Sequence, residues 1–168
     1  LALLATISAA QSSLLPAVAQ AVPASVLLPP RMIGRDAELA ALHASWQLGQ
    51  VVALIGEAGL GKTRLLQAFV EARSGVVRAA GRPGDAGVPF ATLARLLRAV
   101  LAAHCVPLAP ARTQELALVL PELGNPLALA GAAHKLLLQR SVDATLADAM
   151  TLGLRALLID DLHFADDA

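Results

Sequence analysis

The hydrophobic pattern of this 168-residue chain predicts helices that alternate with short strands. Helical spacing of apolar residues predicts helices over about 36–48, 62–73, 90–104 and 131–153, with shorter ones between the prolines of 107–126. Short apolar runs predict buried strands over about 50–55, 76–81 and 156–159. Strands that alternate with helices favour a parallel sheet, so the pattern predicts an α/β fold.

A glycine-rich stretch joins the first predicted strand to the helix that follows it. The sequence GEAGLGKT, residues 56–63, fits the motif G-x-x-x-x-G-K-[ST] at every fixed position. Glycines let backbone N–H groups turn inward around phosphate oxygens, and a helix N-terminus carries a partial positive charge toward the same anion. Lys62 would reach the β- and γ-phosphates, and Thr63 would offer its hydroxyl to Mg²⁺. The predicted phosphate-binding residues are Gly56, Glu57, Ala58, Gly59, Leu60, Gly61, Lys62, Thr63 and Arg64.

Two acidic residues end the last predicted strand, in ALLIDDLHFADDA. A carboxylate at the C-terminal edge of a parallel strand faces the crevice in which open α/β sheets bind ligands. Asp160 would therefore hold Mg²⁺, and Asp161 would orient or deprotonate an attacking water. Taken alone, the pattern fits a helix N-cap or a solvated turn equally well. The glycine-rich loop earlier in the chain favours the metal site.

Charge and composition exclude some classes of partner. Thirteen basic residues balance thirteen acidic ones, so no strong field attracts nucleic acid or acidic lipid. The single cysteine, Cys105, fits a reducing cytoplasm, and its apolar surroundings predict a buried thiol. No apolar run is long enough to cross a bilayer, so we expect no membrane partner.

The first 30 residues carry no charge, and charge begins at Arg31. We place a domain boundary there, with a leader over 1–30 that is disordered or assigned to the protein in error. The leader resembles the apolar core of a signal peptide but lacks a basic start and an initiating Met, which disfavours secretion.

With both halves of the site present, residues 31–168 resemble the STAND branch of P-loop ATPases in the AAA+ superfamily. The likeness is to the ATPase module of large LuxR-type, MalT-like bacterial transcriptional regulators. The segments MIGRDAEL, VVALIGEAGLGKTRLL, LPELG and LLIDDLHFADDA carry this resemblance. The second is similar to the family's Walker A motif and the last to its Walker B motif, with Phe164 where Trp is usual.

The resemblance implies a three-layer α/β/α P-loop fold with a parallel sheet, here truncated after the Walker B strand. It also implies that Gly34 and Arg35 line the adenine-ribose side of the pocket, that ATP and Mg²⁺ are the cofactors, and that Lys62 and Asp161 serve catalysis. Asp161 stands where vigorous AAA+ motors use Glu, so the resemblance implies slow hydrolysis that suits a switch. Any DNA contact would be made by a C-terminal helix-turn-helix absent from this chain, and nucleotide-dependent self-association would occur in the full-length protein.

Three functions follow as hypotheses. The favoured one is the nucleotide switch of a signal-transducing, LuxR-family transcriptional regulator located in the cytoplasm. A second is an inactive truncated fragment of such a regulator, or the ATPase module of a cyclase- or kinase-linked signalling protein. A third is a small-molecule kinase or a GTPase, which is disfavoured because the chain has no N-K-x-D guanine signature.

Overall fold

A computed structural model describes residues 32–71, 73–126 and 132–166 of the chain. The leader expected over 1–30 lies outside the described residues. The chain divides into two units, Leu1–Gly34 and Arg35–Ala168, and every element described below belongs to the second. Within the described ranges, none of the helices has the length and apolarity that crossing a bilayer requires.

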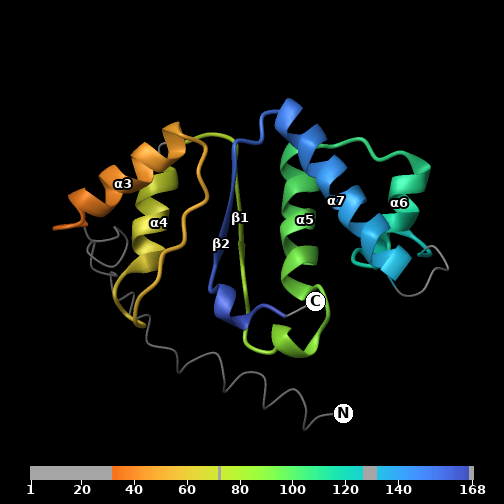
Figure 1. The fold of residues 1–168 in the computed structure, drawn as a ribbon, viewed down its shortest axis with the longest axis horizontal. Coiled ribbons are helices and arrows are strands. Elements are labelled where there is room, and N and C mark those ends of the chain that lie inside the picture. The colour runs from red at the N-terminus through yellow and green to blue at the C-terminus, as the bar shows by residue number, and fades with distance from the viewer. Residues whose placement is uncertain (1–31, 72, 127–131, 167–168) are drawn as a thin grey trace, which may run out of the picture. The chain divides into compact units, whose positions relative to one another are not determined.

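Helices and strands occur in nearly the order that the hydrophobic pattern predicts (Figure 1). Helices α3, α4, α5 and α7 confirm the four predicted helices, and α6 with the 3₁₀ turn η2 confirms the short helices of the proline-rich stretch. The elements are α3 (Asp36–Gln47), α4 (Lys62–Glu71), β1 (Val76–Ala80), η1 (Asp85–Gly87), α5 (Ala91–His104), α6 (Pro110–Leu116), η2 (Pro121–Leu123), α7 (Ala132–Thr151), β2 (Ala156–Asp160) and η3 (Leu162–Phe164).

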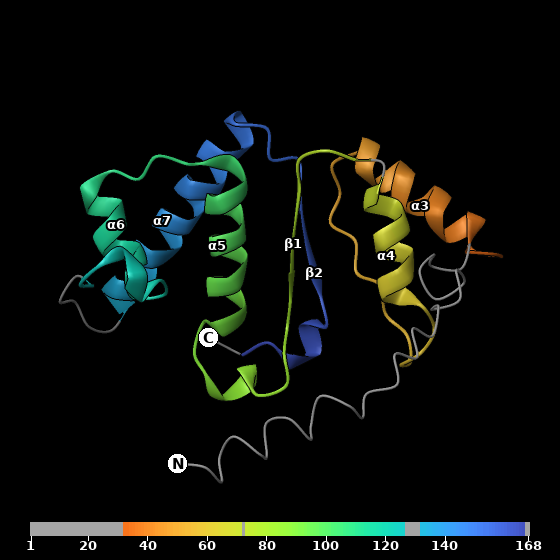
Figure 2. The same cartoon turned by 180° about the vertical axis from the view of Figure 1, so that it is seen from behind.

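The two strands pair in parallel, in a register that runs from Val76 opposite Ala156 to Ala80 opposite Asp160. Both strands therefore end at the same edge of the sheet. Helix α5 packs beside β1, and α7 packs against both α5 and α6, as the views from both sides show (Figures 1 and 2). The α/β class is confirmed in this coarse form, and the three-layer arrangement stays a prediction.

The strand predicted over 50–55 is wrong. Residues 50–57 form no strand, and the side chain of Ile55 is 94 % exposed. A strand needs a partner for its backbone N–H and C=O groups, and the only ladder among the described residues joins β1 to β2. The run VVALI has the composition of a buried strand, but no strand in the described part of the chain pairs with it.

Two hydrophobic clusters form the core, and α5 contributes to both. The first cluster joins the sheet to α5 and α7, and the second joins α5 to α6, α7 and the turn before η2. Their buried members are Val77, Ala79, Leu96, Val100, Val106, Ala149 and Leu154 in the first, and Ala94, Leu97, Leu116, Val119, Leu120 and Leu138 in the second.

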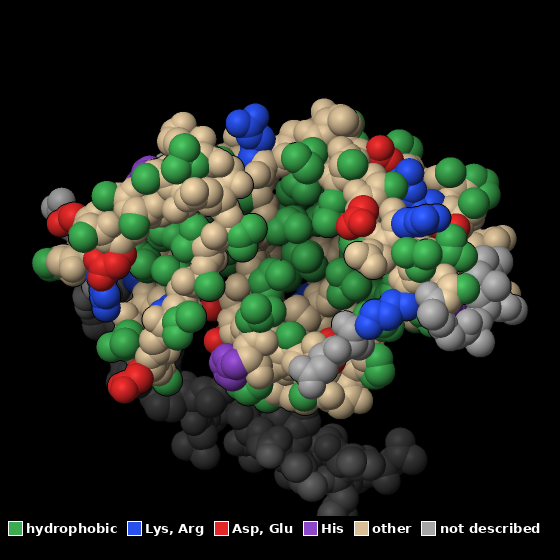
Figure 3. All heavy atoms as spheres, viewed as in Figure 1, with side chains coloured by type: hydrophobic (Ala, Val, Ile, Leu, Met, Phe, Trp, Pro, Cys, Tyr) green, Lys and Arg blue, Asp and Glu red, His purple; other side chains and the backbone are tan. Residues whose placement is uncertain are grey.

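Some apolar side chains remain at the surface. Leu157 and Ile159 of β2 are 37 % and 38 % exposed. Figure 3 shows hydrophobic side chains at the surface in the middle of one face.

The burial predicted for Cys105 is also wrong, because this residue ends α5 in a left-handed conformation (φ 47°) and its thiol is exposed.

Helices α3 and α4 pack against each other through aromatic side chains. The ring of Phe69 in α4 meets that of Trp46 in α3 edge-on, with centroids 5.9 Å apart. The guanidinium of Arg73 lies 3.8 Å from the centroid of Phe69 and hydrogen-bonds the Nδ1 atom of His43 at 2.7 Å. These contacts hold the helix that follows the glycine-rich loop against the helix that precedes it.

Candidate nucleotide-binding site

The glycine-rich loop turns over residues 58–61 and opens directly into α4 at Lys62. Gly59 and Gly61 have φ angles of 82° and 77°, which residues with a side chain rarely adopt. The loop therefore needs glycine at both places. Its backbone leads into the N-terminus of a helix, the arrangement that binds phosphate in many proteins.

The ammonium group of Lys62 folds back over its own loop. Its Nζ donates hydrogen bonds to the carbonyl oxygens of Gly56 at 2.8 Å and Glu57 at 2.9 Å. In the described residues, the backbone N–H groups of 57–61 donate to no protein acceptor. The loop thus brings together one cation and a row of exposed backbone N–H groups without a protein acceptor, which are the hydrogen-bond donors that a phosphate group requires.

Arg35 links the start of α3 to the tip of this loop. Its Nη2 donates to the carbonyl oxygen of Leu60 at 2.9 Å, and its Nη1 forms an ion pair with Glu38. The hydrogen bond from Arg35 lowers the pKa of Glu38. Arg35 therefore lies at the glycine-rich loop, while its role beside the adenine and ribose stays a prediction.

The other residues predicted for the half of the site around the glycine-rich loop are exposed or make contacts elsewhere. Thr63 is exposed on the first turn of α4, as are Glu57 and Ala58 in the loop. The guanidinium of Arg64 pairs with Glu71 at 3.3 Å, about two turns along the same helix. Gly34 belongs to the first unit and has a left-handed φ of 72°. Their roles in binding a nucleotide stay predictions.

The second half of the site is the turn after β2. Asp160 is the last residue of the strand, and its Oδ1 accepts a hydrogen bond from the backbone N–H of Asp161 at 3.0 Å. Asp161 adopts a left-handed conformation (φ 50°, ψ 40°) and is exposed. Asp tolerates this conformation better than most residues. The strand end and the turn thus present two adjacent carboxylates at the sheet edge, as the sequence predicts.

Thr63 and Asp160 offer the kinds of oxygen ligand that Mg²⁺ takes when it is shared with a phosphate, and their joint role stays a prediction. No group of three or more His, Cys, Asp or Glu side chains within the described ranges is arranged to hold a metal ion by itself. Mg²⁺ prefers oxygen ligands and commonly takes one or two from protein, with phosphates and water supplying the rest. A hydroxyl from Thr63 and a carboxylate from Asp160 suit that mode. No hydrogen bond or ion pair among the described residues joins the Lys62 loop to the two acids.

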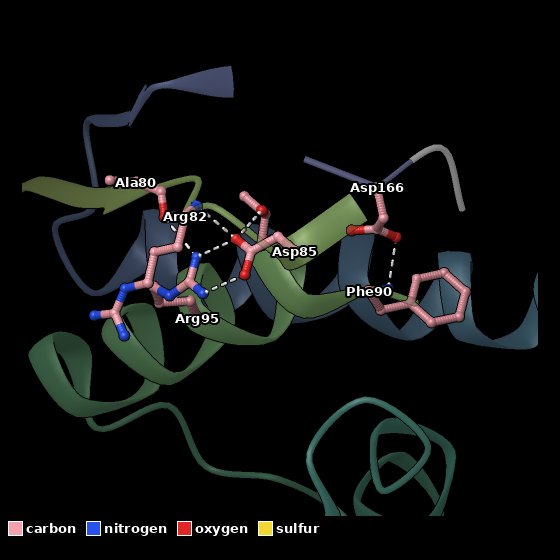
Figure 4. Close-up of polar contacts among 7 residues, drawn as sticks. Ala80, Arg82, Asp85, Phe90, Arg95 and Asp166 are labelled. Carbon is pink, nitrogen blue, oxygen red and sulfur yellow. Dashed lines mark hydrogen bonds and ion pairs between the residues drawn. The ribbon is translucent and has the colours of Figure 1, made fainter. Parts of the chain in front are cut away.

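The structure adds contacts that the sequence analysis missed. Asp85 accepts hydrogen bonds from the backbone N–H of Arg82 at 2.8 Å and from both terminal nitrogens of Arg95 at 2.9 and 3.0 Å (Figure 4). The hydrogen bonds from Arg95 are the main cause that lowers the pKa of Asp85 to about 2. Asp166 accepts a hydrogen bond from the backbone N–H of Phe90 at 2.6 Å. These pairs lie 10 and 76 residues apart and have no periodic signature in the sequence.

The chain belongs to the AAA ATPase domain family, whose model matches residues 31–168. Compared with the curated proteins and with the solved structures, the chain matches none. Membership of this family supports nucleotide binding. It agrees with the Walker A and Walker B motifs that the sequence analysis identified.

Proposed function

We propose that this chain binds ATP with Mg²⁺ and hydrolyses it slowly, as the nucleotide switch of a signal-transducing regulator. The observation that carries the proposal is the glycine loop, which holds the Lys62 ammonium against the carbonyl oxygens of Gly56 and Glu57 and opens into α4. An arriving phosphate offers this ammonium a stronger, charged acceptor than two carbonyl groups. Lys62 would then exchange its loop contacts for the β- and γ-phosphates.

Thr63 on the first turn of α4 and the two acids at the end of β2 and just after it would complete the site. Thr63 and Asp160 would hold Mg²⁺, which neutralises charge on the phosphates. Asp161 would orient the attacking water, and its side chain is one methylene shorter than the Glu of faster ATPases. A shorter reach makes a slow reaction the expected one. Gly34 and Arg35 would lie on the base and ribose side.

The output that we propose for this nucleotide switch is transcriptional regulation of the LuxR type, in the cytoplasm. Its support is the resemblance of MIGRDAEL and LLIDDLHFADDA to segments of those regulators. DNA would be bound by a helix-turn-helix domain of the full-length protein, and ATP would favour its self-association. Sedimentation of the full-length protein with ATP and with ADP tests this self-association, because identical sedimentation profiles would contradict it.

Titration with a fluorescent ATP analogue tests nucleotide binding. The chain has two lysines, Lys62 in the loop and Lys135 on the exposed surface of α7, so each can be changed with the other as control. Lys62→Ala should weaken binding by at least about tenfold, since a charge-assisted hydrogen bond contributes about 1.5–3 kcal/mol. Lys135→Ala should bind as the wild type does. Equal affinity for all three proteins would refute the proposal, and stronger competition by GTP than by ATP would favour a GTPase.

A further inference from the structure

One loop, residues 81–90, is hydrogen-bonded at both of its ends to the acidic turn, by which we mean residues 160–166 at the end of β2 and after it. At the first end, the backbone N–H of Gly81 donates to the carbonyl oxygen of Asp160 at 2.9 Å. Gly81 is buried, and a Cβ atom added to it would lie 2.3 Å from the carbonyl oxygen of Asp161. No side chain fits at that distance. Glycine is required here because the backbone of the acidic turn passes so close.

At the other end of the loop, Asp166 reaches back to the start of α5. Phe90 precedes that helix with a left-handed φ of 61° and provides no side-chain cap. The carboxylate of Asp166 accepts its backbone N–H instead, at 2.6 Å (Figure 4). A carboxylate at a helix N-terminus is stabilised by the unsatisfied N–H groups there. The segment that follows Asp160 and Asp161 is thereby tied to α5.

The loop is itself held in place. Asp85 lies inside it, is 7 % exposed, and accepts hydrogen bonds from Thr92 at 3.1 Å and from Arg95. Arg95 also donates to the carbonyl oxygen of Ala80, the last residue of β1. The loop is therefore fixed to both the strand before it and the helix after it. It can act as a rigid support for the turn that it contacts.

We propose that Gly81 and Asp166 are positioning residues that set the orientation of the Asp160 and Asp161 carboxylates toward Mg²⁺. This inference rests on the proposed function. Gly81 places the carbonyl of Asp160 and leaves space for the left-handed Asp161, and Asp166 fixes the far end of the same turn. Neither residue is expected to touch the nucleotide.

The test measures the affinity of the full chain for a fluorescent ATP analogue, with Mg²⁺ and with EDTA. Gly81→Ala and Asp166→Ala should each reduce the gain in affinity due to Mg²⁺ by roughly tenfold, the usual effect of removing a partner behind a metal ligand. Affinity in EDTA should stay within about twofold of wild type, because the Lys62 loop is unchanged. Asp166→Asn keeps an oxygen acceptor for the backbone N–H of Phe90, so this variant should retain most of the gain in affinity due to Mg²⁺.

Two control variants separate positioning from general damage. Gly87 lies in the same loop, and an added Cβ would meet nothing within 4 Å, so Gly87→Ala should match wild type. Asp143 is exposed on α7, which makes Asp143→Ala the control for Asp166→Ala. Equal losses in Mg²⁺ and in EDTA, or an unchanged Mg²⁺ gain in Gly81→Ala and Asp166→Ala, would overturn the inference and leave nucleotide binding intact. A wild-type chain that binds no better than Lys62→Ala would instead contradict the proposed function, and this inference with it.

Discussion

Gly59 offers the sharpest test of the glycine-rich loop. The motif allows any residue at this position, whereas the backbone conformation in the structure favours glycine. Its φ is 82°, and an added Cβ would meet nothing within 4 Å. Gly59→Ala therefore introduces backbone strain without a steric clash. A left-handed conformation costs a residue with a side chain about 1–2 kcal/mol. Residues 56–61 are exposed and outside any ladder, so the substituted loop can relax when it is free and must recover the strained conformation on binding.

The strain then appears in the affinity. At 1.4 kcal/mol for each tenfold change, the Kd for ATP should rise by roughly 5–30-fold. The Kd of the Gly59→Asn variant should rise less, because Asn tolerates the left-handed region better than Ala does. Titration with a fluorescent ATP analogue in EDTA isolates the loop from the metal site, and Gly87→Ala is the matched control. An unchanged Kd for Gly59→Ala would mean that the loop does not bind phosphate in this conformation, and the reasoning from its geometry would be wrong.

Other predictions concern stability and exposure. Leu97 is fully buried, so Leu97→Ala should cost about 2–5 kcal/mol in a denaturant titration, and a loss under 1 kcal/mol would contradict the core described above. The pKa of Asp85 is lowered from 3.8 to about 2, so its ion pair contributes fully above about pH 5 and this contribution is lost progressively as the pH falls through 4 to 2 and below. The stability difference between wild type and Asp85→Asn should shrink over that range, and a difference independent of pH would refute it. Cys105 is exposed, so a thiol reagent should modify it in the folded protein at nearly the rate of a free thiol; protection would contradict its position at the end of α5.

The hydrophobic pattern predicted the helices well because helical spacing is a local property of the sequence. Leu42 in α3 and Leu65 and Phe69 in α4 are buried. The loop motif also predicted the turn into α4, since glycine content and the following helix are both local properties. Asp160 was placed correctly at a strand end for the same reason.

Features that depend on distant segments were not predictable in this way. The run over 50–55 has strand composition, but pairing decides whether a strand forms, and pairing is not a local property. Gly81 only marked the end of the strand predicted over 76–81, because its contact with Asp161 exists only once β1 and β2 are paired in register. Asp166 lies 76 residues from Phe90, so nothing in the sequence near either residue indicates their hydrogen bond.

The position of α5 has a consequence for how the described part of the chain unfolds. Leu96 and Val100 face one cluster, Ala94 and Leu97 face the other, and the single helix is common to both. Loss of α5 would remove buried contacts from both clusters at once, so the sheet and helices α6 and α7 should lose amide protection together, as one cooperative unit.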